Sequence, residues 1–143
     1  MSRALVLDTN VVLDLFVFDD PGAIALKDAL RARRLRWVAT EGMREELARV
    51  LDYPLLARRL AARGLGAPGV LACFDAHSER VEPAVPAPVA CRDPDDQPFI
   101  DLAVAHRALL VSKDAEVLRL RKRLAPHSAE ACAVVPALFL EPA

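Results

Sequence analysis

Four carboxylates stand at points in the sequence where their charge could do chemistry. They are Asp8, Glu46, Asp96 and Asp114, and they come from four separate segments of the chain. Two like charges about 4 Å apart repel by on the order of 4 kcal/mol at an effective dielectric constant of 20. Several such pairs would rival the roughly 5–15 kcal/mol that stabilises a whole domain. If the fold brings these acids together, the cluster must take up protons, capture basic side chains or bind cations.

A cluster of this kind is suited to hard divalent cations. Carboxylate oxygens without a His or Cys partner select Mg²⁺ or Mn²⁺ rather than zinc. Such ions lower the pKa of a coordinated water, hold a phosphate and stabilise charge on the attacking and leaving oxygens of an in-line displacement. The four acids therefore indicate hydrolysis of phosphodiester bonds. All four would hold the metal, and one of them would orient or deprotonate the attacking water.

Each aspartate also has a simpler interpretation. Asp8 directly follows an apolar run, and Asp114 follows another through Ser112 and Lys113. At such places Asp is a common turn residue and a good N-cap of a helix. Asp96 begins a predicted helix, where capping alone would stabilise by about 1 kcal/mol. The residue types alone leave both interpretations open.

Glu46 belongs to a predicted helix over 41–51 that carries an apolar stripe. At about 100° per residue, Glu46 lies on the margin of that stripe, while Glu45 points away from it. Glu46 is thus expected to face the protein and Glu45 to face water. The alternative is a boundary residue that pairs with Arg44 or Arg49 and extends towards solvent.

The elements that must position these acids alternate along the chain. Ala4–Leu7 and Ala108–Val111 are continuous apolar runs, typical of strands covered on both faces, and shorter strands are expected at 37–39, around Val81 and at 132–135. Helical composition marks the segments 21–34, 41–51, 55–63, 68–77, 96–107 and 115–124. This alternation predicts a three-layer α/β/α sandwich with a central, mainly parallel sheet. In such sheets ligands bind outside the carboxyl ends of the strands, where Asp8 and Asp114 fall.

One domain over residues 1–143 is expected from the length, which should bury roughly 68% of the unfolded surface. Five of the eleven prolines fall between Pro83 and Pro98, which predicts an extended loop. Too few residues lie on either side of it for two independent cores.

Composition and charge exclude several classes of protein. The chain is 54% hydrophobic and 27% charged, too apolar for disorder and too interrupted by charge for a membrane span. The apolar stretch near Met1 is too short for a signal peptide, so a cytoplasmic protein without a membrane partner is expected. The net charge of −1 supplies no overall basic field, so any nucleic acid must be bound locally.

Other chemistries lack their motifs. The three cysteines, Cys73, Cys91 and Cys132, contain no Cys-x-x-Cys pair and are expected to be reduced, buried thiols. The three histidines are isolated, and the five glycines form neither a P-loop nor a dinucleotide fingerprint. No serine has a Gly-x-Ser-x-Gly setting. Arginine clusters at 31–36, 58–63 and 119–123 are mostly expected to be solvated faces, although a few must bind phosphate if the substrate is RNA.

Taken in order, the acidic motifs resemble a known family. The motifs are Asp8-Thr9-Asn10 after the first strand, Glu46-Leu47 before Val50-Leu51, Asp93-Pro94-Asp95-Asp96 before Phe99-Ile100-Asp101-Leu102-Ala103, and Leu110-Val111-Ser112-Lys113-Asp114. Together they resemble the PIN domain, and more narrowly its bacterial branch of toxins from toxin–antitoxin systems. The similarity covers nearly the whole chain.

The resemblance implies a PIN-like sandwich with a metal-dependent ribonuclease site. Position by position, Asp8, Glu46, Asp96 and Asp114 match the four family acids, and the family's supporting polar residues match Thr9, Asn10 and Ser112. The implied cofactor is Mg²⁺ or Mn²⁺, and the implied substrate is RNA. An antitoxin protein and a homodimer are further implied partners.

Two positions depart from the family pattern. Many relatives carry Gly where this chain has Lys113, and often an acid where it has Gln97. Lys113 could direct an ammonium group at the acids, meet the RNA backbone, or project into solvent.

Two other functions fit parts of the sequence. The first is a non-catalytic RNA- or protein-binding module on the same fold, favoured by Lys113 and the near-zero net charge. The second is phosphoryl transfer through an aspartyl intermediate on Asp8. The second is weaker, because Thr9-Asn10 follows Asp8 and no further strand-end acid comes two residues later.

Overall fold

Five parallel strands form the centre of the computed structural model, which describes residues 3–140. The strands are β1 (Arg3–Leu7), β2 (Leu35–Ala39), β3 (Ser78–Arg80), β4 (Leu109–Val111) and β5 (Glu130–Cys132), in the spatial order β3-β2-β1-β4-β5. The chain adds strands on one side of β1 and then crosses to the other. The strand order therefore reverses between β1 and β4, which is where open α/β sheets place their ligands.

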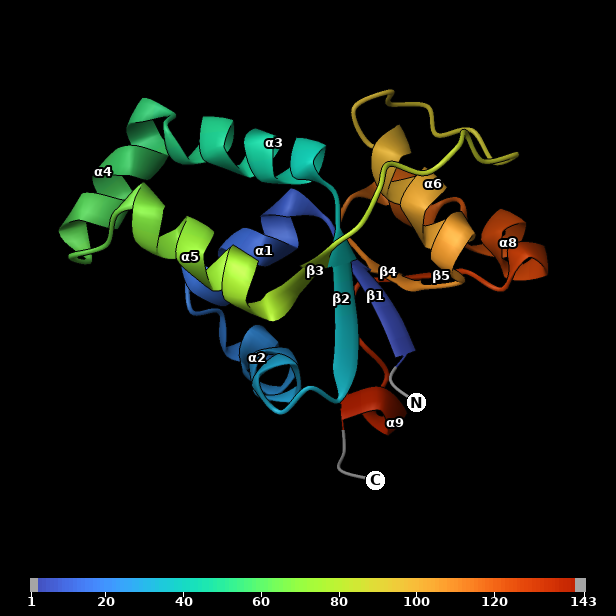
Figure 1. Ribbon diagram of the computed structural model, residues 1–143, viewed down its shortest axis with the longest axis horizontal. Helices are drawn as coiled ribbons and strands as arrows, with labels where there is room; N and C mark the ends of the chain where they lie inside the picture. The colour runs from blue at the N-terminus through green and yellow to red at the C-terminus, as the bar shows by residue number, and fades with distance from the viewer. Residues whose placement is uncertain (1–2, 141–143) are drawn as a thin grey trace.

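Helices cover both faces of this sheet, which confirms the predicted three-layer α/β/α sandwich. They are α1 (Thr9–Phe16), α2 (Ile24–Arg31), α3 (Glu41–Leu51), α4 (Pro54–Ala62), α5 (Ala67–His77), α6 (Gln97–His106), α7 (Ala115–Leu118), α8 (Arg121–Leu124) and α9 (Ala137–Leu140). Two short 3₁₀ turns, η1 (Pro21–Ala23) and η2 (Ala125–His127), complete the described elements. In Figure 1, α1, α2 and α5 lie on one side of the sheet and α6 and α8 on the other.

The core consists of the apolar runs that the sequence marks as strands. Leu5, Val6, Leu109 and Leu110 are fully buried, because helices pack on both faces of β1 and β4. On the α5 side, buried Trp37 of β2 meets the ring of Phe74 edge-on, with 4.9 Å between ring centroids. These contacts hold the strand ends in fixed positions and therefore position the residues that follow them.

Helix α1 is absent from the sequence-based expectations, and this is the main correction to them. Its sequence, Thr-Asn-Val-Val-Leu-Asp-Leu-Phe, is rich in β-branched and large apolar side chains, which favour strands as much as helices. Burial of Val11, Val12, Leu13 and Leu15 overrides that propensity, since α1 packs between α2, α3 and α5. Asp8 is consequently both the residue after β1 and the N-cap of a helix.

Smaller differences concern the ends of elements. The expected helix over 21–34 is split into η1 and α2, and the backbone turns at Arg33, whose φ is +59°. The helix expected over 115–124 consists of two short helices, α7 and α8. The last strand is Glu130–Cys132 rather than 132–135. The three cysteines are free, as expected, but each is half-buried rather than buried.

The proline-rich segment is an extended loop, as predicted, and Gln97 anchors it. The Gln97 side chain accepts a hydrogen bond from the Cys91 backbone N–H at 2.6 Å and donates to the Val89 carbonyl at 2.9 Å. Asp101 accepts from the Ala87 backbone N–H at 2.8 Å and from the Gln97 amide at 2.8 Å. The polar residue that departs from the family pattern thus holds the loop that leads to Asp96.

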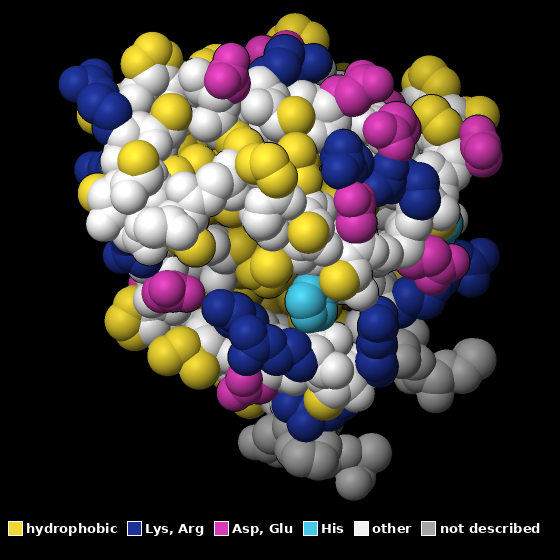
Figure 2. Space-filling view, turned by 60° about the vertical axis from the view of Figure 1, so that its left-hand side comes forward, with side chains coloured by type: hydrophobic (Ala, Val, Ile, Leu, Met, Phe, Trp, Pro, Cys, Tyr) yellow, Lys and Arg dark blue, Asp and Glu magenta, His cyan; other side chains and the backbone are white. Residues whose placement is uncertain are grey.

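One face of the molecule exposes apolar side chains. Figure 2 shows it, with the α3, α4 and α5 side of Figure 1 turned forward and with basic side chains gathered along its lower part. Among the large apolar residues of the described chain, Ile24, Tyr53, Leu55 and Leu65 are 40–66% exposed. None of the helices within residues 3–140 has the length and apolarity needed to cross a bilayer.

We expect Gln97→Ala to release the loop before α6. Three hydrogen bonds are lost and two backbone groups of the loop lose their partner, which should lower the free energy of unfolding by roughly 1–3 kcal/mol. Urea denaturation measures the free energy of unfolding. Limited proteolysis should show faster cleavage within residues 82–96 in the variant than in the wild type. The exposed Glu45→Ala variant is the control and should change neither. Equal proteolysis of both variants would contradict the anchoring role.

Candidate active site

Asp8 lies at the carboxyl end of the central strand and is held on both of its carboxylate oxygens. Leu7 is paired with Val111 of β4, and the Asp8 backbone N–H continues the ladder to the Val111 carbonyl at 3.0 Å. Oδ1 accepts a hydrogen bond from the Asn10 backbone N–H at 3.3 Å, and Oδ2 accepts from the Ser112 hydroxyl at 2.7 Å. The side chain is buried, with the residue 7% exposed, so its orientation is set by these bonds.

Ser112 connects the first acid to the last. Its side chain is fully buried, and its hydroxyl donates to Asp8 while accepting from the Asp114 backbone N–H at 3.0 Å. Asp114 in turn caps α7, since its Oδ1 accepts from the Glu116 backbone N–H at 2.8 Å. The capping role that the sequence allowed for Asp8 and Asp114 is therefore real, and it coexists with their closeness at the β1/β4 edge.

Asp96 does not cap α6, although it is the residue before the helix. Its side chain makes no capping hydrogen bond, and its Oδ2 is buried without a hydrogen-bond partner among the described residues. A buried polar atom without a partner is costly, so it marks either a strained or a functional position. Here it lies beside the other acids of the strand ends.

The pKa of Asp96 shows how close the acids are. Burial raises this pKa, and the Asp114 carboxylate raises it further by accepting a hydrogen bond from the protonated form and by repelling the ionised one. The negative charges of Asp8 and Asp93 add to the effect, and the pKa of Asp96 rises to about 7. Three of the four predicted acids, Asp8, Asp96 and Asp114, thus lie within electrostatic reach of one another.

Glu46 joins the site from α3 through Thr9. The Thr9 hydroxyl donates to Oε2 of Glu46 at 2.8 Å, which links the helix that follows β1 to the helix that follows β2. Glu46 is half-buried and Glu45 is exposed, as the helical periodicity predicts. Among residues 3–140, neither Arg44 nor Arg49 pairs with Glu46, and Arg44 instead binds Asp75 at 2.8 Å.

The supporting residues contribute unequally. Ser112 and Thr9 act through their hydroxyl groups. Asn10 is exposed, and its recorded bond to the site comes from its backbone N–H rather than its side chain.

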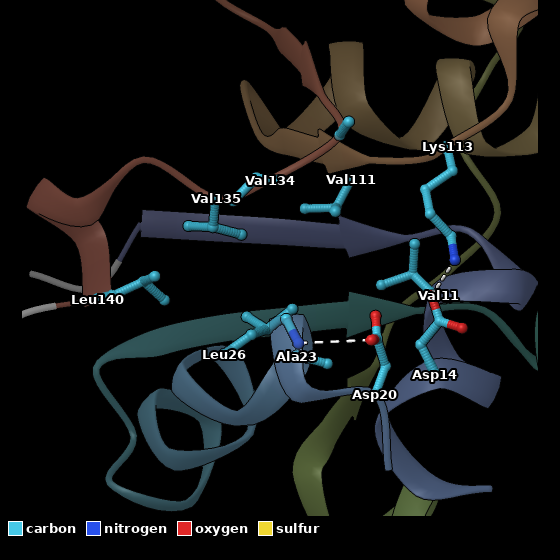
Figure 3. Close-up of a pocket in the computed structure, with 12 residues that line it drawn as sticks. Val11, Asp14, Asp20, Ala23, Leu26, Val111, Lys113, Val134, Val135 and Leu140 are labelled. Atoms are coloured by element: carbon cyan, nitrogen blue, oxygen red, sulfur yellow. Dashed lines mark hydrogen bonds and ion pairs between the residues drawn. The ribbon is translucent and has the colours of Figure 1, made fainter. Parts of the chain in front are cut away.

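Lys113 pairs with an acid other than the four predicted ones. Its ammonium group pairs with Asp14 of α1, at the rim of an apolar pocket between α1, α2 and the segment after β5 (Figure 3). Val11, Leu26 and Val111 are among the side chains that line this pocket. The Lys113 side chain is 53% exposed and is engaged in this ion pair, which the sequence did not predict.

Sequence reasoning missed one neighbour of the acids. Cys91 lies close enough to Asp96 and Asp114 for their charges to raise the pKa of its thiol, after burial as the main cause. Its place in the sequence, within the proline-rich loop and five residues before Asp96, carries no signal of this position. Only the anchoring of that loop by Gln97 brings the thiol there.

The donor set fits a hard divalent cation, but the side chains are not arranged for one as they stand. All four acids offer oxygen ligands, and none of them forms an ion pair with a basic side chain within the described range. The orphaned Oδ2 of Asp96 is the atom that a cation would satisfy best. No three His, Cys, Asp or Glu side chains of residues 3–140 are close enough together to hold a metal without moving.

Fold and site together define a class of protein, an α/β sandwich with acids gathered where the strand order reverses. Comparison with protein families finds the PIN domain, matched over residues 4–116. This range contains all four acids, and the chain belongs to the PIN-domain family, whose members are commonly nucleases. A search of curated proteins found no significant match.

We expect the free energy of unfolding to fall as the pH rises from about 4 to about 7. Asp96 binds a proton more tightly in the folded protein than in the unfolded chain, because its pKa rises from 3.8 to about 7 on folding. Folding is therefore favoured while this carboxyl is protonated, and the advantage is lost as it ionises in the native state. Asp96→Asn should remove this dependence and be more stable at pH 8 by on the order of 1 kcal/mol, after allowance for solvent screening.

Urea denaturation at pH 4.5, 6 and 8 in EDTA measures the effect. Asp95→Asn is the matched control, since it removes the same charge from an exposed neighbour and should keep the wild-type slope. Parallel pH profiles for wild type and Asp96→Asn would show that Asp96 titrates normally and does not lie against the other acids.

Proposed function

We propose that this protein is a metal-dependent endoribonuclease that hydrolyses RNA phosphodiester bonds. The observation that carries the proposal is the group of acids at the β1/β4 edge, which no basic side chain of the described residues neutralises and in which Asp96 is pushed towards a neutral pKa. A protein that places like charges this close gains nothing in stability from them. The chain belongs to a family whose members are commonly nucleases, which supports a catalytic role for these acids.

In this proposal Asp8, Glu46, Asp96 and Asp114 hold Mg²⁺ or Mn²⁺. The bound metal supplies a water of low pKa and positive charge for the phosphate oxygens. Because no three of these groups stand at ligating distance, side chains must turn towards the ion as it binds. Asp8 is fixed by Ser112 and the Asn10 backbone, so it provides the immobile part of the site. Glu46 and Asp96 have fewer bonds and supply the adjustment.

Without a metal, the surroundings of Asp96 raise its pKa to about 7, and in this proposal a bound cation would take the place of that proton. One of the four acids would orient or deprotonate the attacking water. Thr9 donates a hydrogen bond to Glu46 and so orients this carboxylate.

We further propose that the protein, as a single domain over residues 1–143, is the toxin of a cytoplasmic toxin–antitoxin pair. An antitoxin that covers the acids would keep it inactive, in line with the branch that the motifs resemble. The exposed apolar side chains of Ile24 at the start of α2, of Tyr53 just before α4 and of Leu55 in α4 offer a surface for a homodimer. The non-catalytic binding module is the alternative outcome of the experiments below.

We expect purified protein to cleave single-stranded RNA in Mg²⁺ or Mn²⁺, with loss of activity in EDTA. Asp8→Asn should lower kcat at least about a hundredfold, because it removes a charged, fixed ligand. Glu46→Gln should have an effect of similar size, whereas Glu45→Gln, next to it on the outer face of α3, should cleave like wild type.

Gel analysis of a labelled RNA measures all four proteins. Activity that survives both EDTA and Asp8→Asn would refute the assignment. If the wild type binds RNA without cutting it and titration calorimetry shows no divalent-ion binding, the binding module is the correct function.

We expect induced expression of the wild-type chain in a bacterial host to arrest growth, while Asp8→Asn expressed at the same level does not. The reason is that a free ribonuclease without its inhibitor degrades cellular RNA. Growth curves with immunoblots for expression level provide the measurement. Growth arrest by both proteins, or by neither at equal expression, would separate this chain from the toxin branch even if it cleaves RNA in vitro.

A further inference from the structure

A cleft opens beside Glu46, between α3 and the segment that leads into α6. Its walls include Thr40, Met43, Glu46 and Arg49 on one side, and Pro94, Asp95, Pro98 and Phe99 on the other. Figure 1 shows α3 and α6 facing each other across this end of the sheet, above the carboxyl ends of the strands. The cleft therefore extends the acidic edge along the surface rather than forming a separate site.

Arg49 is the basic side chain of this cleft, and it has no fixed partner. It is exposed, and within residues 3–140 it takes part in no hydrogen bond or ion pair. Arginines nearby are bound to acids: Arg44 to Asp75, and Arg80 to Asp75 and Glu41. Arg49 is thus a guanidinium whose donors are available for a ligand.

The spacing relates Arg49 to the acids. It lies three residues after Glu46 on α3, so the two side chains stand on the same side of the helix, about one turn apart. Yet they do not pair with each other, since Glu46 takes its hydrogen bond from Thr9. In the proposed function Glu46 binds the metal at the scissile phosphate. A guanidinium one helical turn away is well placed to bind the adjacent phosphate of the same strand.

The shape of the cleft suits one nucleotide unit. Its volume is about 260 Å³, which is just below the roughly 300–1,000 Å³ of pockets that enclose drug-sized ligands. The exposed rings of Pro94 and Pro98 add flat apolar surface opposite the arginine.

We propose that this cleft holds the nucleotide next to the scissile phosphate of a single-stranded RNA, and that Arg49 binds its phosphate. The inference rests on the proposed nuclease function for the position of the scissile phosphate, but the cleft as a phosphate-binding site stands on its own geometry. Arg49 is a positioning residue in this account. It sets where the strand lies, and the acids carry out the reaction.

The test is the salt dependence of RNA cleavage and of RNA binding. For a single strand, each phosphate contact contributes about −0.7 to the slope of log K against log salt concentration. Arg49→Gln should reduce the steepness of that slope by about 0.7 and raise KM on the order of tenfold, with kcat nearly unchanged. Arg49→Lys keeps the positive charge, so its slope of log K against log salt concentration should equal that of the wild type. A purely structural role of Arg49 would not predict that a lysine restores the salt dependence.

Arg31→Gln is the matched control. Arg31 is an exposed arginine at the end of α2, and the same substitution there removes the same charge far from the cleft. Cleavage of an unstructured labelled oligoribonucleotide is measured from 50 to 300 mM KCl. Binding is measured over the same range by fluorescence anisotropy, in the Asp8→Asn background so that the probe stays intact.

The cleavage assay and the binding assay together distinguish failure of this inference from failure of the proposed nuclease function. An unchanged slope and KM in Arg49→Gln, or equal changes in Arg31→Gln, would overturn the role of Arg49 while leaving cleavage intact. If the wild type does not cleave RNA but its binding slope depends on Arg49, the nuclease function falls and the phosphate site stands.

Discussion

The pairing of β1 with β4 is the constraint on which the site depends. It places Leu7 opposite Val111, so that the residues after both strands leave the sheet at the same edge. Ser112 then joins them, with its hydroxyl on Asp8 and its oxygen accepting from the Asp114 backbone. A shift of register by one residue would turn Ser112 to the opposite face and break this bridge, because side chains alternate along a strand. The hydrophobic burial of β1 and β4 is what prevents such a shift.

Repulsion between the acids is then handled in different ways by different residues. Asp8 and Asp114 are compensated by hydrogen bonds from hydroxyl and backbone donors. Glu46 is compensated by Thr9. Asp96 Oδ2 has no such donor among residues 3–140, and the proton affinity of this carboxyl rises instead. Uptake of a proton and binding of a cation relieve the same excess of negative charge, so they compete at this carboxyl.

The positive charges of the protein are used mostly elsewhere. Lys113 forms an ion pair with Asp14. On the surface, Asp75 of α5 pairs with Arg44 of α3 and with Arg80 of β3. These pairs keep cations out of the acidic edge, which must stay negative if it is to attract a divalent ion. Arg49 differs from them because it lies in the same cleft as Glu46 and forms no ion pair within the described part of the chain. A net charge of −1 therefore hides a strong local separation of charge.

The sequence by itself determined the parallel sheet, and it named the four acids as candidates. Continuous apolar runs, prolines in the loop and the periodicity of α3 are local signals, and each one follows from the chemistry of neighbouring residues. Helix α1 was not predicted from the sequence, because its β-branched residues lack a clear helical propensity. Burial against other helices makes this segment helical. Tertiary structure alone decided that Lys113 turns to Asp14, that Gln97 brings Cys91 to the acids, and that Asp96 lacks a capping bond. These outcomes depend on which side chains from distant segments come within about 3 Å of each other, and hydrogen bonds and ion pairs of that reach leave no pattern in the order of residues.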